Sequence, residues 1–288
     1  MTSSESFDPR YVEARRVLLD ALFALAPHNE AIIVVGAQAV YLRTGASDIA
    51  VAPFTTDGDL ALDPSHLGDD PKLETALRGA NFQLVEDRAG NVQPGSWITG
   101  VKIDGQDHII PLDLLVPEAA APAPGKRGAR LGSHGNQAAI KVRGIEATLV
   151  DHDTMRIESL DPTDERSIDA EVAGSAALLI AKAHKIGERI ASGNVNRYDD
   201  KDAADVLRIM QTTNPTAIAK TMAMLREHPI AGEATSAGLD YLQQLFGRRG
   251  AGGIAMAGRS LREAVPEDRI VVICTAYISA LFDALGDQ

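Results

Sequence analysis

The chain has 288 residues, 45% hydrophobic and 24% charged, which is the composition of a soluble globular protein with one large or two ordinary domains. Its net charge of -12 argues against a general nucleic-acid coat protein, because nonspecific binding depends on Lys and Arg that neutralise phosphates. No apolar run is long enough to cross a bilayer and the acidic N-terminus is unlike a signal peptide, so we expect a cytoplasmic protein with no membrane partner. The single cysteine, Cys274, excludes a disulfide framework and a cysteine-ligated metal.

Apolar spacing and turn residues predict alternating helices and strands in the first half of the chain. The expected helices lie near 11–26, 38–44 and 71–78. The expected strands lie near 31–35, 57–62, 82–86, 97–103, 108–116, 139–142 and 145–149. Residues 117–136, which are rich in Pro, Ala, Gly and basic side chains, are predicted to form a loop.

The pattern becomes helical from about residue 172. Helices are expected near 173–192, 201–211, 215–226, 231–246 and 270–285, and the glycines of 250–253 indicate a hinge or loop. The predicted fold is therefore α/β (α+β). It has an N-terminal mixed sheet with flanking helices over 1–165 and a C-terminal all-helical domain over 166–288.

The first candidate site lies where the apolar run 32–35 ends at Gly36 and a helix follows. A glycine lets the backbone approach phosphates, and a helix N-terminus favours anions. The next strand carries Asp57 and Asp59, which share one face because side chains alternate along a strand. This arrangement predicts a site for a metal-bound polyphosphate.

A third carboxylate, Asp113, stands in the otherwise apolar strand 108–116, where a charge is costly unless it is paired or metal-bound. Hard oxygen ligands suit Mg²⁺, or Mn²⁺ in its place. We therefore predict that Asp57, Asp59 and Asp113 are catalytic metal ligands for an NTP substrate. The alternative is that Asp57 and Asp59 are a solvated strand end and that Asp113 faces water.

Charged residues of the second half suggest where the phosphates are bound. Lys182 and Lys185 share a helix face, and we expect Lys182 to meet the triphosphate, with Lys185 in reserve. Asp202 and Asp205 would orient Lys182 or bind the base and sugar edge of the nucleotide. The alternatives are an ordinary solvated basic face and carboxylates that cap a helix.

A basic loop is the candidate for contact with an RNA backbone. Its charges come from Lys126, Arg127, Arg130, Lys141 and Arg143. No aromatic residue lies among them, so stacking on bases is not supported, and a plain surface loop is the alternative.

In this order the motifs resemble the DNA polymerase β-type nucleotidyltransferase superfamily, whose signature is a small-residue turn, then DxD, then a later strand Asp. Within it the chain is similar to the AbiEii/MenT-type toxin nucleotidyltransferases. These add a helical lysine, matched by Leu-Leu-Ile-Ala-Lys-Ala-His-Lys at 178–185. They also add a charged motif, matched by Arg-Tyr-Asp-Asp-Lys-Asp-Ala-Ala-Asp-Val at 197–206. The resemblance covers about residues 31–207.

The resemblance implies transfer of a nucleotide from an NTP to RNA, at the 3′ end of tRNA, by a toxin that a cognate antitoxin protein controls. It also implies that the helical domain contributes Lys182 and Asp202 to the cleft. The residues predicted to bind the nucleotide are Gly36, Ala37, Gln38, Thr56, Lys182, Lys185, Asp202 and Asp205.

One departure is Ala37, which stands where the superfamily usually has Ser or a second Gly. Nucleotide affinity would then be weaker, or Gln38 would compensate. The same fold modifying a protein or small-molecule hydroxyl, and an inactive relative that binds nucleotide or a partner, are the alternatives. We also hypothesise that phosphorylation of Thr55 or Thr56 would inactivate the enzyme, because the added charge would repel the triphosphate.

Overall fold

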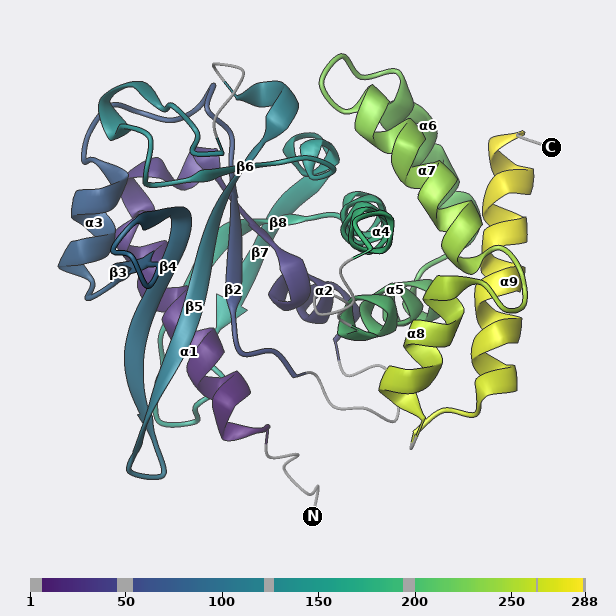
Figure 1. The fold of residues 1–288 in the computed structure, drawn as a ribbon, viewed down its shortest axis with the longest axis horizontal. Coiled ribbons are helices and arrows are strands. Elements are labelled where there is room, and N and C mark those ends of the chain that lie inside the picture. The colour runs from purple at the N-terminus through teal and green to yellow at the C-terminus, as the bar shows by residue number, and fades with distance from the viewer. Residues whose placement is uncertain (1–6, 46–53, 122–126, 194–199, 263, 287–288) are drawn as a thin grey trace. The chain divides into compact units, whose positions relative to one another are not determined.

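The structure is a computed structural model that describes residues 7–45, 54–121, 127–193, 200–262 and 264–286 (Figure 1). The chain divides into two compact units, each assembled from segments that are separate in the sequence. The first unit is Met1–Gln38, Ala52–Val142 and Asp153–Val172, and the second is Ala39–Val51, Arg143–His152 and Ala173–Gln288. The sequence predicted one boundary, between residues 165 and 166.

The described part of the first unit is built on a mixed, eight-stranded sheet, so the fold is of the mixed α/β class. Its strand order is β3-β4-β5-β2-β1-β8-β7, with β6 beside β5. The strands are β1 (Ile32–Val35), β2 (Gly58–Leu62), β3 (Gln83–Glu86), β4 (Val92–Ile103), β5 (Gln106–Pro117), β6 (Ile140–Val142), β7 (His152–Glu158) and β8 (Ser167–Ala173). β1 is antiparallel to β2 and parallel to β8, whereas β2 is parallel to β5.

Helices α1 (Pro9–Ala24), α2 (Gly36–Thr44) and α3 (Leu73–Gly79) follow the predicted ranges closely. Asp8 caps α1 by accepting a hydrogen bond from the Arg10 backbone, and Pro9 stands at its first turn, where a missing N–H costs nothing. The apolar face of α1 is buried and includes Leu18 and Leu19, and this helix packs on the sheet. A 3₁₀ segment, Ala26–Ala31, connects α1 to β1.

The second unit is mainly helical, as its apolar spacing predicted. Its helices are α4 (Ser175–Ala191), α5 (Asp200–Thr212), α6 (Pro215–Arg226), α7 (Gly232–Phe246), α8 (Gly252–Leu261) and α9 (Glu267–Leu285). Helix α8 was not predicted, because its initial glycines indicated a loop. No helix among the described residues combines the length and apolarity needed to span a membrane.

The predicted strand at 145–149 is wrong, because Glu146–Leu149 forms a 3₁₀ helix. The turn begins at Gly144, whose φ is +89 and whose added Cβ would overlap the His184 ring. The Glu146 carboxylate accepts a hydrogen bond from the Gly144 backbone, and the Thr148 hydroxyl donates to the Ile145 carbonyl. These local bonds replace the strand pairing that the apolar run suggested.

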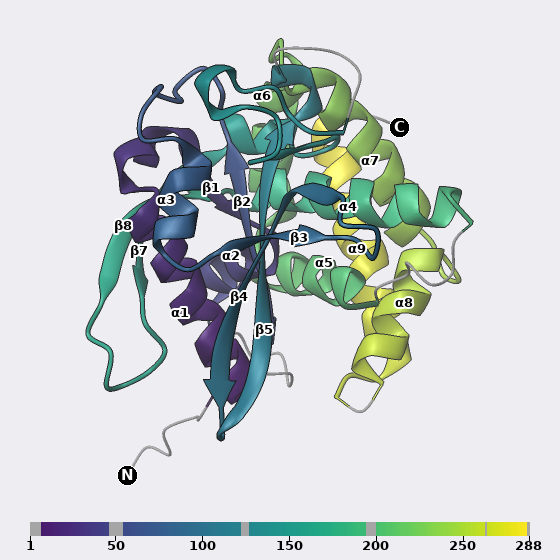
Figure 2. The ribbon, with the colours of Figure 1, turned by 60° about the vertical axis from the view of Figure 1, so that its left-hand side comes forward.

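The β4–β5 hairpin is longer than predicted and is the long ribbon that projects in Figure 2. Its turn has two residues, Asp104 and Gly105, both at positive φ, which matches the right-handed twist of the strands. Gln106 therefore belongs to β5 and pairs with Ile103.

Candidate active site

The candidate site of the first unit starts at Gly36, which joins β1 to α2. Gly36 has φ +69, a left-handed conformation that favours glycine, and an added Cβ would overlap the Asp59 carboxylate. Register places Val35, the residue before Gly36, opposite Asp59. The Asp59 carboxylate therefore lies directly against the turn that opens α2, where backbone amides favour an anion such as a phosphate.

Asp113 is the register partner of Asp59 on the neighbouring parallel strand β5. Paired residues of adjacent strands lie about 4.8 Å apart and project to the same face. Both side chains are half-buried in the described fold. The sheet thus places two carboxylates side by side next to the Gly36 turn.

Asp57 lies one residue before β2 and is also half-buried. Its carboxylate accepts a hydrogen bond from the hydroxyl of Thr55, and Thr55 is itself buried. Of the two threonines considered for phosphorylation, Thr56 is the more exposed. Among the described residues, no group of three or more His, Cys, Asp or Glu side chains is arranged so that it could hold a metal ion.

The polar groups of Gln38, a residue predicted to bind the nucleotide, are hydrogen-bonded within the protein. Gln38 is fully buried, accepts a hydrogen bond from Arg15 at 2.9 Å and donates to the Asp57 carbonyl at 3.4 Å. The hypothesis that Gln38 compensates for Ala37 by contacting phosphate is therefore not supported by this geometry. Ala37 and Thr56 are half-buried, and their nucleotide contacts stay predictions.

Arg15 is the residue of this region that the sequence reasoning missed. It is 4% exposed on α1, next to the buried Ala14 and one turn before the buried Leu19. An arginine on the apolar face of a helix was the available signal, since such a side chain needs buried polar partners.

The second unit contains a compact cluster of buried charges on α4 and α5. The Lys182 ammonium donates to Asp202 and to Asp205, at 2.7 Å in each case, and all three side chains are buried. Asp202 also contacts Lys185 at 3.2 Å and Arg189 at 2.8 Å. The predicted orientation of Lys182 by Asp202 and Asp205 is what the structure shows, whereas its contact with a triphosphate stays a prediction.

Attraction between opposite charges keeps Lys182 protonated and Asp202 deprotonated. Burial alone would lower the pKa of Lys182, but the two carboxylates outweigh it and hold the pKa well above its usual value. Burial would raise the pKa of Asp202, but three neighbouring cations hold it below its ordinary value. The pKa of Asp205 is raised, because burial outweighs its attraction to Lys182.

The predicted RNA-binding residues are divided between the two units, and their role in RNA binding stays a prediction. Lys126 lies outside the described residues. Arg127 and Arg130 are exposed, and the Arg127 carbonyl accepts a hydrogen bond from the Lys141 backbone, so this loop runs beside β6. Arg143 belongs to the second unit, where it pairs with Glu233 at 2.5 Å.

No protein-family model and no curated protein matches this chain.

Proposed function

We propose that this chain is a metal-dependent nucleotidyltransferase. The observation that carries the proposal is the pairing of Asp59 with Asp113 against the Gly36 turn at the start of α2. Helix N-terminal amides suit the phosphates of a nucleotide, and adjacent carboxylates suit the cation that accompanies them.

The donor set fits Mg²⁺ or Mn²⁺. Mg²⁺ usually takes one or two carboxylates and completes its shell with water and substrate phosphates, so the Asp59–Asp113 pair suffices as protein ligands. Asp57 would be the third ligand, and its carboxylate would leave the Thr55 hydroxyl to take this role. When bound, such a cation neutralises phosphate charge and makes the attacking hydroxyl more acidic. The half-buried setting of the pair strengthens these charge interactions.

We propose RNA as the acceptor, at the 3′ end of tRNA, and a toxin–antitoxin pair as the setting. Support for the acceptor comes from the exposed Arg127 and Arg130, and support for the setting comes from the resemblance of the motifs to toxin nucleotidyltransferases. A protein or small-molecule hydroxyl as acceptor would use the same carboxylates.

The test is transfer of labelled nucleotide, with each NTP in turn, Mg²⁺ and total tRNA. We expect label on RNA with the wild type and none with Asp59→Ala or Asp113→Asn. The control is Asp107→Asn, which changes an exposed carboxylate on the same strand as Asp113 and should leave transfer intact. Nucleotide binding without labelled RNA would instead indicate a protein or small-molecule acceptor. Absence of both binding and transfer would overturn the proposal and leave an inactive relative.

A further inference from the structure

Arg15 is a buried arginine whose partners in the structure are all neutral. Its guanidinium donates to the Gln38 side-chain oxygen at 2.9 Å, to the Glu158 carbonyl at 3.2 Å and to the Tyr11 hydroxyl at 3.2 Å. Within the described residues no carboxylate is paired with it, and burial lowers its pKa. Burying a charge without a counter-ion is costly, so the stability of this arginine depends on its three neutral hydrogen-bond acceptors.

The polarity of these groups fixes the orientation of the Gln38 amide. A guanidinium only donates hydrogen bonds, so Gln38 must present its oxygen to Arg15. The amide nitrogen then faces the Asp57 carbonyl, 3.4 Å away, and a carbonyl only accepts. Because Gln38 is fully buried, water offers it no alternative partner. The hydrogen bonds therefore run in one direction, from Arg15 to Gln38 to the backbone of Asp57.

This chain of bonds joins the two halves of the candidate site. Gln38 is the third residue of α2, which opens at the Gly36 turn, and Asp57 carries the first of the proposed metal carboxylates. The register of β2 with β5 starts at Gly58, so Asp57 precedes the part of the strand that the sheet aligns. The hydrogen bond from Gln38 therefore restrains the Asp57 backbone at a position that the β2–β5 pairing does not reach.

We propose that Arg15 and Gln38 are positioning residues that fix the Asp57 backbone relative to the phosphate-facing turn. The inference rests on the proposed nucleotidyltransferase function. It assigns no contact with substrate to either residue.

The variant Gln38→Glu separates positioning from general stability. A carboxylate keeps an oxygen for Arg15 and adds an ion pair to a buried guanidinium that has none among the described residues, so the fold should be retained. It replaces the donor facing Asp57 with an acceptor, which repels the carbonyl. Gln38→Asn is the uncharged companion, because its side chain is one methylene shorter and reaches only one of the two partners.

Three measurements are compared with the wild type: the urea midpoint of unfolding, steady-state transfer kinetics, and hydrogen exchange of peptides that cover 54–62. For both variants we expect kcat to fall on the order of 10- to 100-fold with the NTP KM within about threefold. Exchange over 54–62 should rise, while the midpoint of Gln38→Glu stays at or above that of the wild type.

The outcomes distinguish the inference from the function on which it rests. If the wild type transfers nucleotide and both variants keep its kcat, the inference is overturned and the proposed function stands. If the wild type transfers nothing, the proposed function fails. In that case unchanged exchange over 54–62 in both variants would overturn the inference independently, and raised exchange would support the structural part of it. If Gln38→Glu does not fold, the kcat and hydrogen exchange of Gln38→Asn decide whether the inference stands.

Discussion

Gly36 carries two separable constraints, its left-handed backbone and its closeness to Asp59. We expect Gly36→Ala to lower the free energy of unfolding by more than the roughly 1–2 kcal/mol that a left-handed alanine costs. The excess arises because the added methyl must displace the Asp59 carboxylate. Nucleotide transfer should be lost with it.

The matched control is Gly45→Ala, because Gly45 has φ +57 and no atom of the described residues lies within 4 Å of an added Cβ. Denaturant unfolding of both variants gives the comparison. Equal losses of stability in Gly36→Ala and Gly45→Ala would show that the Asp59 carboxylate does not crowd the added methyl group at position 36.

Lys182 is the buried ammonium that Asp202 and Asp205 share. In Lys182→Met both Asp202 and Asp205 stay buried, and breaking a buried pair from one side typically costs about 3–5 kcal/mol. Lys185→Met is the control, because the Lys185 side chain is 42% exposed and an exposed pair is worth about 0–1 kcal/mol. Urea unfolding measures both.

The double variant Lys182→Met/Asp205→Leu should recover much of this loss, because Asp202 keeps Lys185 and Arg189 as partners. A double variant no more stable than Lys182→Met would show that the cost comes from packing rather than from leaving the Asp205 carboxylate without Lys182.

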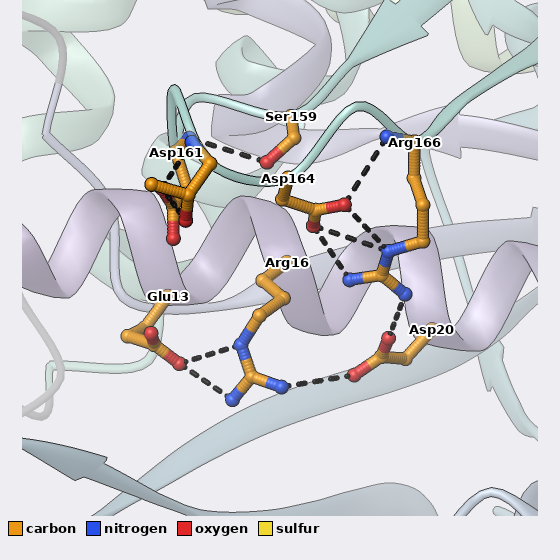
Figure 3. Close-up of polar contacts among 8 residues, drawn as sticks. Glu13, Arg16, Asp20, Ser159, Asp161, Asp164 and Arg166 are labelled. Atoms are coloured by element: carbon orange, nitrogen blue, oxygen red, sulfur yellow. Dashed lines mark hydrogen bonds and ion pairs between the residues drawn. The ribbon is translucent and has the colours of Figure 1, made fainter.

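Among the elements, the β7–β8 connection is held to α1 by a network of ion pairs (Figure 3). Arg166 contacts Asp164 at 2.8 Å and Asp20 of α1 at 2.6 Å, and Arg16 contacts Asp20 at 3.6 Å. A hydrogen bond from the Arg166 side chain is the largest cause that lowers the pKa of Asp164, to about 2. A carboxyl whose pKa is lowered on folding contributes stability above its unfolded pKa and loses it as the pH falls.

We therefore expect Asp164→Asn to be less stable than the wild type at neutral pH. The difference should shrink as the pH falls from about 4 toward about 2, where the native carboxyl takes up its proton. Unfolding free energies at a series of pH values measure it, with Asp107→Asn on the β4–β5 hairpin as an exposed control. A difference that does not vary with pH would contradict the assignment.

The elements that the sequence predicted well are those with one buried face. Helices α4 to α7 and α9 carry apolar residues at helical spacing, and their ranges differ from prediction by only a few residues. Strand β7 was missed because most of its side chains are exposed or half-buried, so it lacks apolar alternation. The strand predicted at 145–149 was wrong for the opposite reason. It is almost wholly buried, and a short buried run does not distinguish a strand from a helical turn.

The candidate site was predictable where it follows from strand geometry. Strand alternation suggested that Asp57 and Asp59 share a face, and a charge in an apolar strand suggested Asp113 as a third carboxylate. The structure places Asp59 and Asp113 in register. The bonds from Arg15 to Gln38 join segments 23 residues apart, and no periodicity encodes them. The spacing of Lys182 with Lys185 predicted a shared face on one helix, and that of Asp202 with Asp205 a shared face on the next. The burial of Lys182 and Asp202 depends on how α4 packs against α5.

At the scale of the whole molecule, a net charge of -12 limits how the proposed RNA acceptor would be held. Long-range repulsion of the phosphate backbone must be overcome by a few local cations, so binding should be weak, and its salt dependence should reflect the few phosphate contacts that these cations make. The exposed Arg127 and Arg130 are the candidates in the described part of the loop.

For each of Arg127→Ala and Arg130→Ala, we expect weaker tRNA binding at 50 mM salt. The slope of log K against log salt should decrease by about one unit or slightly less for each lost phosphate contact. Fluorescence anisotropy over a salt series measures this slope, with Lys102→Ala as the control because Lys102 is already paired with Asp107. If neither arginine changes the slope while Asp59-dependent transfer to RNA persists, the loop is an ordinary surface and the RNA is bound elsewhere. If the acidic chain binds no RNA at any salt concentration, the acceptor is more consistent with a small molecule or a protein hydroxyl.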